Sequence, residues 1–286
     1  MYDVAILGGG PAGLSAAITA RARNKSVVVI SNHYRANPLY RAQEVPNYPG
    51  LPDISGSELL RRMHDQAVAL GAEMLEKRLI SISDMGGSWF IGAEDAFVEA
   101  SAVILAGGVV RGSKFPGEEE YLGRGVSYCA TCDGMLYRGK NVVVYGESEK
   151  AEEEAAYLQE IGCTVVYVSR KGWQGVVREQ IPFLQIKKME IGGAETVTHV
   201  MIDDQRVLCD GVFLLRSAVS PMDLLPGLAV DGGHIRVDRE MKTNIPGIFA
   251  AGDCVGQPYQ IAKATGEGQV AVLSAVDYLN TTKGSR

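Results

Sequence analysis

The sequence predicts an α/β protein made of two dinucleotide-binding-type (Rossmann-like) domains, with the second domain inserted into the first. An apolar strand, a glycine turn and a helix follow one another at the N-terminus and again near residue 142. This order is how a parallel, doubly wound sheet begins. A further glycine-ended strand, GIFAAGD (247–253), and a closing helix complete the first domain after the second has ended.

The composition is that of an ordinary globular protein. The chain has 286 residues, 46% hydrophobic and 22% charged, which is enough for two domains with a substantial core. A net charge of −6 without a long basic run argues against nucleic acid as a partner. The N-terminus lacks the basic region of a secretory signal, and no apolar run approaches membrane-spanning length. We therefore expect a cytoplasmic protein with no membrane partner.

The first motif is GGGPAG at residues 8–13. Gly8, Gly10 and Gly13 satisfy G-x-G-x-x-G between a strand expected at 4–7 and a helix expected at 12–23, and a strand at 27–30 completes the βαβ unit. Such glycines let the backbone approach a pyrophosphate, and the helix N-terminus offers it amide donors. The motif predicts a bound dinucleotide; the alternative is a glycine turn without a ligand.

The middle of the first domain is less regular. A polar stretch at 32–52 contains NYPG (47–50), and it precedes a helix expected at 56–70 and short strands over 73–105. GIFAAGD ends in small residues and then in Asp253, a carboxylate that can hold sugar or ribityl hydroxyls, before a helix expected at 262–279. An Asp after Gly is also common as a helix cap or turn residue. Two glycine-ended strands together favour a flavin nucleotide.

The segment SYCATCDG (127–134) carries the clearest chemistry. Cys129 and Cys132 are separated by two residues and can close a small disulfide, and a helix that begins there would lower the pKa of a thiolate. Asp133 is placed to give or take a proton. The alternatives are half of a zinc site, a structural disulfide and accidental spacing. We expect no metal, because the four widely spaced histidines and the three scattered cysteines supply no second ligand pair. These cysteines, Cys163, Cys209 and Cys254, are interpreted as buried small apolar residues.

GGGPAG, NYPG, GRGVSYCATCDG, GIFAAGD and the inserted βαβ unit together resemble the low-molecular-weight thioredoxin reductases over essentially the whole chain. The resemblance implies an FAD-binding domain (1–113 and 220–286), an inserted redox domain (114–219), a homodimer, and thioredoxin as partner. By position, Cys132 would face the flavin, Cys129 would attack the partner's disulfide, and Asp133 would handle the proton. The resemblance places these residues around FAD: Gly8, Gly10, Pro11, Ala12, Gly13, Ser31, Asn32, Asn37, Leu39, Asn47, Gly107, Gly252, Asp253, Gln260 and Ile261.

The second glycine turn departs from the family pattern. NADPH-using members have G-x-G-x-x-A, whereas residues 146–151 read GESEKA. Ser148 puts a Cβ where a pyrophosphate needs space, and Glu147 and Glu149 add negative charge, at a cost of about 1 to 4 kcal/mol per like-charge pair at contact distance. Arg170 and Lys171, after the strand at 164–169, are interpreted as a solvated strand end. The inserted domain is therefore predicted to keep its fold without binding NADPH.

Two further departures point to another electron donor. Asn37 with Pro38, and Gln260 with Ile261, resemble the pyridine-nucleotide-independent branch of the family, whose donor is reduced ferredoxin. An acidic ferredoxin would need a local basic patch, for which the candidates are Arg21, Arg23 and Lys25, or Arg61 and Arg62. Solvated helix faces explain these residues equally well.

Several alternatives to a ferredoxin-dependent enzyme stay open. They are an NAD(P)H-dependent thioredoxin reductase with a divergent loop, a dithiol oxidase of the same fold, and a flavin-binding redox sensor that does not turn over. Because one cysteine pair cannot touch a buried flavin and an outside protein at once, RGSKFPG (111–117) and SAVSP (217–221) are expected to act as hinges of a domain swing.

Overall fold

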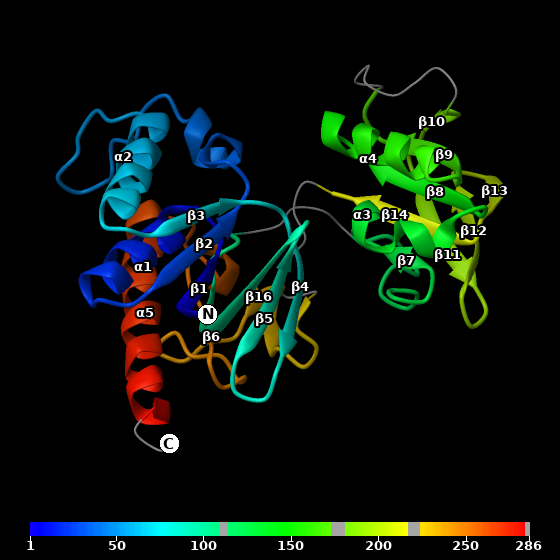
Figure 1. The fold of residues 1–286 in the computed structure, drawn as a ribbon. Helices are drawn as coiled ribbons and strands as arrows, with labels where there is room; N and C mark the ends of the chain where they lie inside the picture. The colour runs from blue at the N-terminus through cyan, green and yellow to red at the C-terminus, as the bar shows by residue number, and fades with distance from the viewer. Residues whose placement is uncertain (109–113, 173–180, 217–223, 284–286) are drawn as a thin grey trace. The chain divides into compact units, whose positions relative to one another are not determined.

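The computed structural model describes residues 1–108, 114–172, 181–216 and 224–283 (Figure 1). The chain divides into two compact units: unit 1 is Met1–Val110 with Val219–Arg286, and unit 2 is Arg111–Ala218. Parts of the predicted hinges and domain boundaries lie outside the described residues. They are the whole hinge at 217–221, residues 111–113 of the other hinge, the boundary at 219–220, and residue 113 of the boundary at 113–114.

Unit 1 is built on a seven-stranded sheet, ordered β3-β2-β1-β6-β5-β4, with β17 also paired to β6. Its central strands are parallel and read as nearly continuous apolar runs, as strands buried on both faces do. β4 and β5 extend the sheet in antiparallel fashion. The strands are β1 (Tyr2–Leu7), β2 (Val27–Ser31), β3 (Glu73–Glu76), β4 (Leu79–Asp84), β5 (Trp89–Ala93), β6 (Ala96–Leu105) and β17 (Ile248–Ala250).

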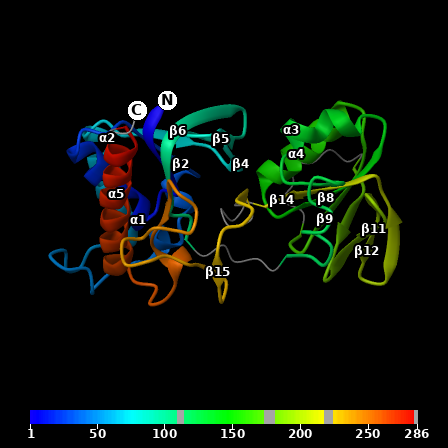
Figure 2. The ribbon, with the colours of Figure 1, turned by 90° about the horizontal axis from the view of Figure 1, so that it is seen from below.

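Three helices cover one face of this sheet: α1 (Pro11–Ala22), α2 (Gly56–Ala69) and α5 (Ile261–Lys283). Figure 2 shows α1 and α5 side by side. Gly268 allows this close approach, because a Cβ at that position would lie 2.0 Å from the carbonyl oxygen of Ala12. The opposite face packs against a second cluster that includes Trp89, Leu225 and Ile235, the last from the hairpin of β15 (Val230–Asp231) and β16 (His234–Ile235).

Unit 2 has a parallel five-stranded sheet, ordered β10-β9-β8-β14-β7, beside an antiparallel sheet ordered β11-β12-β13. α4 (Glu149–Glu160) packs Ala151, Ala155 and Leu158 onto the parallel sheet. A short helix, α3 (Ala130–Asp133), follows β7. The strands are β7 (Val126–Ser127), β8 (Asn141–Gly146), β9 (Thr164–Ser169), β10 (Phe183–Gln185), β11 (Met189–Gly193), β12 (Val197–Ile202), β13 (Gln205–Leu208) and β14 (Gly211–Leu215).

The predicted fold class is confirmed, and the observed elements differ from the predicted ones only at their ends. α4 begins at Glu149 because Ser148 caps it: the Ser148 hydroxyl accepts a hydrogen bond from the Ala151 amide at 3.3 Å. α5 runs to Lys283, four residues beyond the predicted end at 279. Across the residues that the structure describes, no helix combines the length and apolar character needed to cross a membrane.

Candidate active site

The first glycine turn of unit 1 forms an open helix N-terminus. Gly8 has φ +130°, and a Cβ there would lie 2.2 Å from the carbonyl oxygen of Ala106, so only glycine fits. α1 starts at Pro11 after Gly10, which has no side chain to cap it, and the first turn contains no acidic residue. The amides of Ala12 and Gly13 have no intrahelical partner and no acceptor among the described residues. This arrangement fits a pyrophosphate.

The GIFAAGD strand meets this turn. Gly252 has φ +88°, and a Cβ on it would lie 2.9 Å from the Cβ of Ala12. The Gly252 amide donates to Glu267 at 2.9 Å, and the Lys263 ammonium donates to the carbonyl oxygens of Gly252 and Gly256 at 3.2 and 2.6 Å. Burial raises the pKa of Asp253, against the attraction of Lys263. α5 therefore holds the loop through Lys263 and Glu267 and leaves the Asp253 carboxylate without a hydrogen bond to the described residues.

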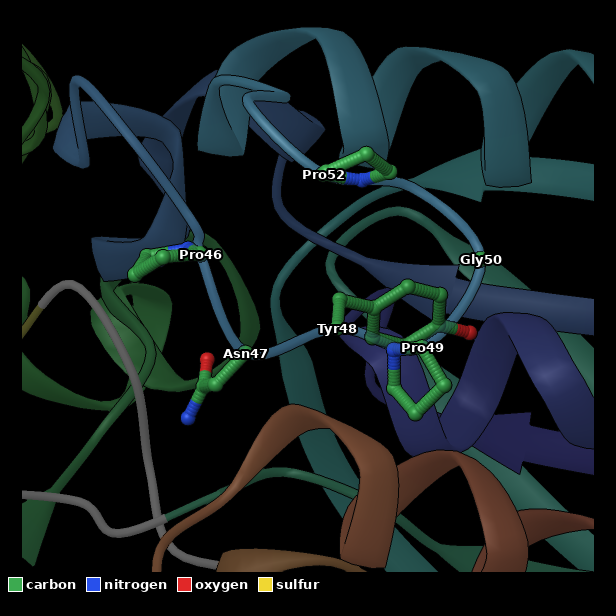
Figure 3. A pocket seen from close by; sticks show the side chains of 6 residues that line it. All are labelled: Pro46, Asn47, Tyr48, Pro49, Gly50 and Pro52. Carbon is green, nitrogen blue, oxygen red and sulfur yellow. The ribbon is translucent and has the colours of Figure 1, made fainter.

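Two loops far apart in the sequence meet beside this turn. The side-chain amide of Asn47 donates to Oε1 of Gln260 at 2.8 Å. The loop of Asn47 borders an open hollow of about 310 Å³ lined by Pro46, Asn47, Tyr48, Pro49, Gly50 and Pro52. Figure 3 shows that these six residues follow one curved loop and that the side chains of Asn47 and Tyr48 extend from it in different directions.

Unit 2 carries the disulfide. Cys129 and Cys132 are joined, with their Cα atoms 5.4 Å apart, at the start of α3. Cys129 is buried, with 2% of its surface exposed, whereas Cys132 is exposed. The Ser127 hydroxyl donates to Asp133 at 2.7 Å and accepts from the Cys129 amide at 3.1 Å. The described residues contain no group of three or more potential metal ligands.

The second glycine turn, at the start of α4, is closed by the protein's own groups. Besides the cap by Ser148, the first turn of α4 contains Glu149 and Glu152. Glu147 accepts a hydrogen bond from the Tyr145 hydroxyl and pairs with Lys171 at 3.2 Å. Although burial opposes it, these partners lower the pKa of Glu147. An incoming phosphate would therefore meet an ionised carboxylate and a donor amide that is already bonded.

Arg170 and Lys171 are exposed, as predicted, but they are not merely solvated. Lys171 pairs with Glu147, and the Arg170 guanidinium lies 5.1 Å from the centre of the Phe115 ring. Arg170 and Lys171, the two cations near the expected place of the 2′-phosphate of NADPH, thus both have local partners.

Some of the predicted flavin residues lie against the first glycine turn of unit 1. A Cβ on Gly9 would lie 2.5 Å from the Ser31 hydroxyl, and one on Gly10 would lie 3.1 Å from the Asn37 amide. The Asn37 side chain caps the turn that carries Leu39, whose carbonyl packs against Gly56, and Gly107 adjoins Gly8. Ile261 is the first residue of α5, and Asn32 is exposed after β2.

Sequence reasoning missed several residues that shape these sites. Lys263 and Glu267 are one helical turn apart, 3.1 Å from each other, just after the Asp253 loop; their i,i+4 spacing was a usable signal. Ser127 lies inside the motif SYCATCDG, but its hydrogen bonds to Asp133 and to the Cys129 amide were not predicted. Glu118 of unit 2, which is completely buried, had no local signal.

Several cations of the predicted basic patches already have partners within unit 1. Arg61 and Arg62 both contact Glu58, and Arg61 also contacts Asp65. Arg21 donates to the backbone carbonyls of Leu70 and Lys25. These residues support neighbouring structure, so neither patch offers a full set of free cations.

Known proteins match this chain along nearly all its length. Residues 2–268 match the family model described as pyridine nucleotide-disulphide oxidoreductase. The chain is 36% identical to a thioredoxin reductase of Treponema pallidum, covering 98% of each protein, and 33% identical to that of Bacillus subtilis, covering 98% and 95%. A solved ferredoxin-flavin thioredoxin reductase of Clostridium acetobutylicum superposes with a TM-score of 0.88 at 41% identity, covering 99% of this chain and 98% of the other.

Proposed function

Because the chain belongs to the pyridine nucleotide-disulphide oxidoreductase family, and within it to the thioredoxin reductases, we propose that it uses FAD to pass electrons from reduced ferredoxin to thioredoxin. One observation carries the choice of donor: of two equivalent helix N-termini, that of α1 is open and that of α4 is closed. Gly10 gives α1 no side-chain cap, whereas Ser148 caps α4 beside a carboxylate cluster. The likeness to the Clostridium acetobutylicum protein supports the same donor.

In unit 1, the amides of Ala12 and Gly13 would hold the pyrophosphate of FAD, and Asp253 would accept hydrogen bonds from its hydroxyls. Bound FAD supplies the ability to take electrons singly and give them up in pairs. The Asn47–Gln260 hydrogen bond joins the two loops that border this site.

In unit 2, the disulfide is the acceptor. Cys132, the exposed sulfur, would receive electrons from the flavin, and Cys129 would exchange with the disulfide of thioredoxin through a mixed disulfide. Asp133, held by Ser127, would give or take the proton of the thiol. Because one cysteine pair cannot touch the flavin and an outside protein at once, a domain swing at the hinge segments is part of the proposal, and the buried Cys129 has in addition to become exposed.

The decisive experiment compares electron donors. Anaerobic stopped-flow mixing with reduced ferredoxin, NADPH and NADH follows bleaching of the flavin, and insulin turbidity with thioredoxin follows turnover. We expect rapid bleaching and turnover with ferredoxin alone. Rapid bleaching by NADPH would refute the proposed donor and favour the divergent-loop reductase. Oxygen consumption with small dithiols would favour a dithiol oxidase, and a flavin that reduces no thioredoxin from any donor would favour a sensor.

Two wider parts of the proposal have separate tests. Light scattering on the purified protein distinguishes the proposed homodimer from a monomer. Cross-linking unit 1 to unit 2 is expected to stop turnover with thioredoxin while the flavin can still be reduced. Unchanged turnover in the cross-linked protein would exclude a domain swing.

A further inference from the structure

Glu118 is a completely buried carboxylate that takes no direct part in the proposed chemistry. Its Oε1 accepts hydrogen bonds from Arg216 and, at 2.9 Å, from the Tyr128 hydroxyl. Its Oε2 accepts from Arg216 at 2.8 Å and from the Phe115 amide at 2.9 Å. Four donors thus fill the acceptor sites of one carboxylate. Burial opposes its charge, but the bonds from Arg216 and Phe115 hold the pKa of Glu118 below its ordinary value.

The four donor groups belong to three residues from different parts of unit 2. Phe115 and Arg216 lie next to the two places where the chain passes between the units, and Tyr128 directly precedes Cys129. The Arg216 guanidinium also lies 5.2 Å from the centre of the Phe115 ring. A buried ion pair is weak evidence for added stability, because desolvation offsets its attraction. What this one does supply is a fixed geometry among three segments.

This fixed geometry extends to the disulfide. Tyr128 is 6% exposed and Cys129 is 2% exposed, whereas Cys132 lies at the surface. The Cys129 amide is held in turn by the Ser127 hydroxyl. A rotation of this backbone that brought the Cys129 sulfur out would have to pull the Tyr128 hydroxyl away from Glu118.

We propose that Glu118 is a positioning residue for the disulfide: acting through Tyr128, it keeps the Cys129 sulfur buried, so that Cys132 is the sulfur presented at the surface of unit 2. Exchange through Cys129 then depends on an opening step that this hydrogen bond opposes. The inference rests on the proposed function only in taking Cys129 and Cys132 as the redox pair.

The test measures how fast each cysteine of the reduced protein reacts with iodoacetamide, in the absence of oxygen, by mass spectrometry of the peptides. In the wild type, Cys132 is expected to react faster than Cys129. Tyr128→Phe removes the hydroxyl that donates to the charged Glu118, and it is expected to speed alkylation of Cys129 about tenfold while that of Cys132 stays unchanged. Tyr121→Phe is the matched control: Tyr121 is 5% exposed, and its hydroxyl makes no hydrogen bond to the described residues.

Glu118→Gln removes the charge and is expected to act in the same direction as Tyr128→Phe. Should Glu118→Gln fail to fold, Tyr128→Phe decides alone. An unchanged ratio of the two alkylation rates in Tyr128→Phe, or a wild type in which Cys129 reacts faster, would overturn the proposal. Since alkylation needs neither ferredoxin nor thioredoxin, an error in the proposed donor leaves this result interpretable.

Discussion

Asn47 donates a 2.8 Å hydrogen bond to Gln260, which lies 213 positions further along the chain. It joins the NYPG loop to the segment before α5. The family resemblance places both residues at the flavin. Their hydrogen bond holds two loops together, which gives the pair a physical role in the proposed site.

Removing the hydrogen bond between Asn47 and Gln260 should weaken the binding of FAD. We expect Asn47→Ala and Gln260→Ala each to raise the dissociation constant of FAD by about two- to fivefold, the range for an exposed neutral hydrogen bond, and the double variant to do little more than either one. Titration of apoprotein with FAD, followed by flavin fluorescence, measures this. Fully additive effects would show that the two side chains act independently; Gln43→Ala, at an exposed position in the same loop, is the control.

The cap of α4 predicts a graded effect on stability. Ser148→Ala should lower the free energy of unfolding by about 1 kcal/mol, because the Ala151 amide loses its acceptor, whereas Ser148→Gly should cost only a few tenths. Urea denaturation followed by circular dichroism measures both. Equal costs for alanine and glycine would show that the hydroxyl does not act as a cap.

The closed loop also predicts a gain of binding. Replacing Glu147 and Ser148 together by glycine removes the carboxylate and the capping group, and it releases Lys171 from its partner. We expect NADPH affinity to increase at least about tenfold over the wild type, since each like-charge contact costs about 1 kcal/mol or more. Isothermal titration calorimetry checks the affinity, with Glu153→Gly on the exposed side of α4 as control. No increase would mean that other residues exclude the nucleotide.

Glu118 predicts a pH-dependent stability. Because its pKa is lowered in the folded protein, its contribution is fully present above its unfolded pKa of about 4.5 and is lost as pH falls through the folded value. Glu118→Gln should therefore cost about 3 kcal/mol at pH 7, and the difference from the wild type should shrink below pH 4.5. Urea unfolding across this range measures it. Glu119→Gln, at an exposed residue paired with Lys114, should change stability by less than about 0.5 kcal/mol.

The remaining cysteines should be inert. Burial raises the pKa of Cys209 and of Cys254 to about 12, so at pH 8 only about one thiol in ten thousand is ionised. Iodoacetamide at pH 8 should modify neither in the folded protein but both in urea, while reduced Cys132 reacts in the same sample. Modification of Cys254 at the rate of Cys132 would contradict its burial.

What sequence predicted well depends on neighbours along the chain. The glycine turn at residues 8–13, the strand periodicities and the Cys129–Cys132 disulfide all arise within a few residues, where steric rules determine the outcome. The Ser148 cap is equally local, yet the prediction considered only the Cβ of Ser148, as an obstacle to a ligand, and not its hydroxyl as a cap of the helix.

What sequence could not predict depends on pairing across the fold. Glu118 and Arg216 are 98 positions apart, and nothing near either residue indicates the other. The partners of Arg61 and Arg62 are local instead: Glu58 and Asp65 lie three or four positions away on the same predicted helix, so their spacing was a usable signal. Charge read along a sequence counts residues, whereas the charge available to a partner depends on which of them are already neutralised.

The topology also determines when each part of the protein is complete during synthesis. Unit 1 needs β17 and α5, both of which come after the last residue of unit 2. A nascent chain that has left the ribosome up to about residue 240 therefore holds all of unit 2, with its cysteine pair, but no Gly252 or Asp253 to finish the flavin site. The cysteine pair is therefore synthesised, as two thiols, before the residues proposed to complete the flavin site have been added to the chain.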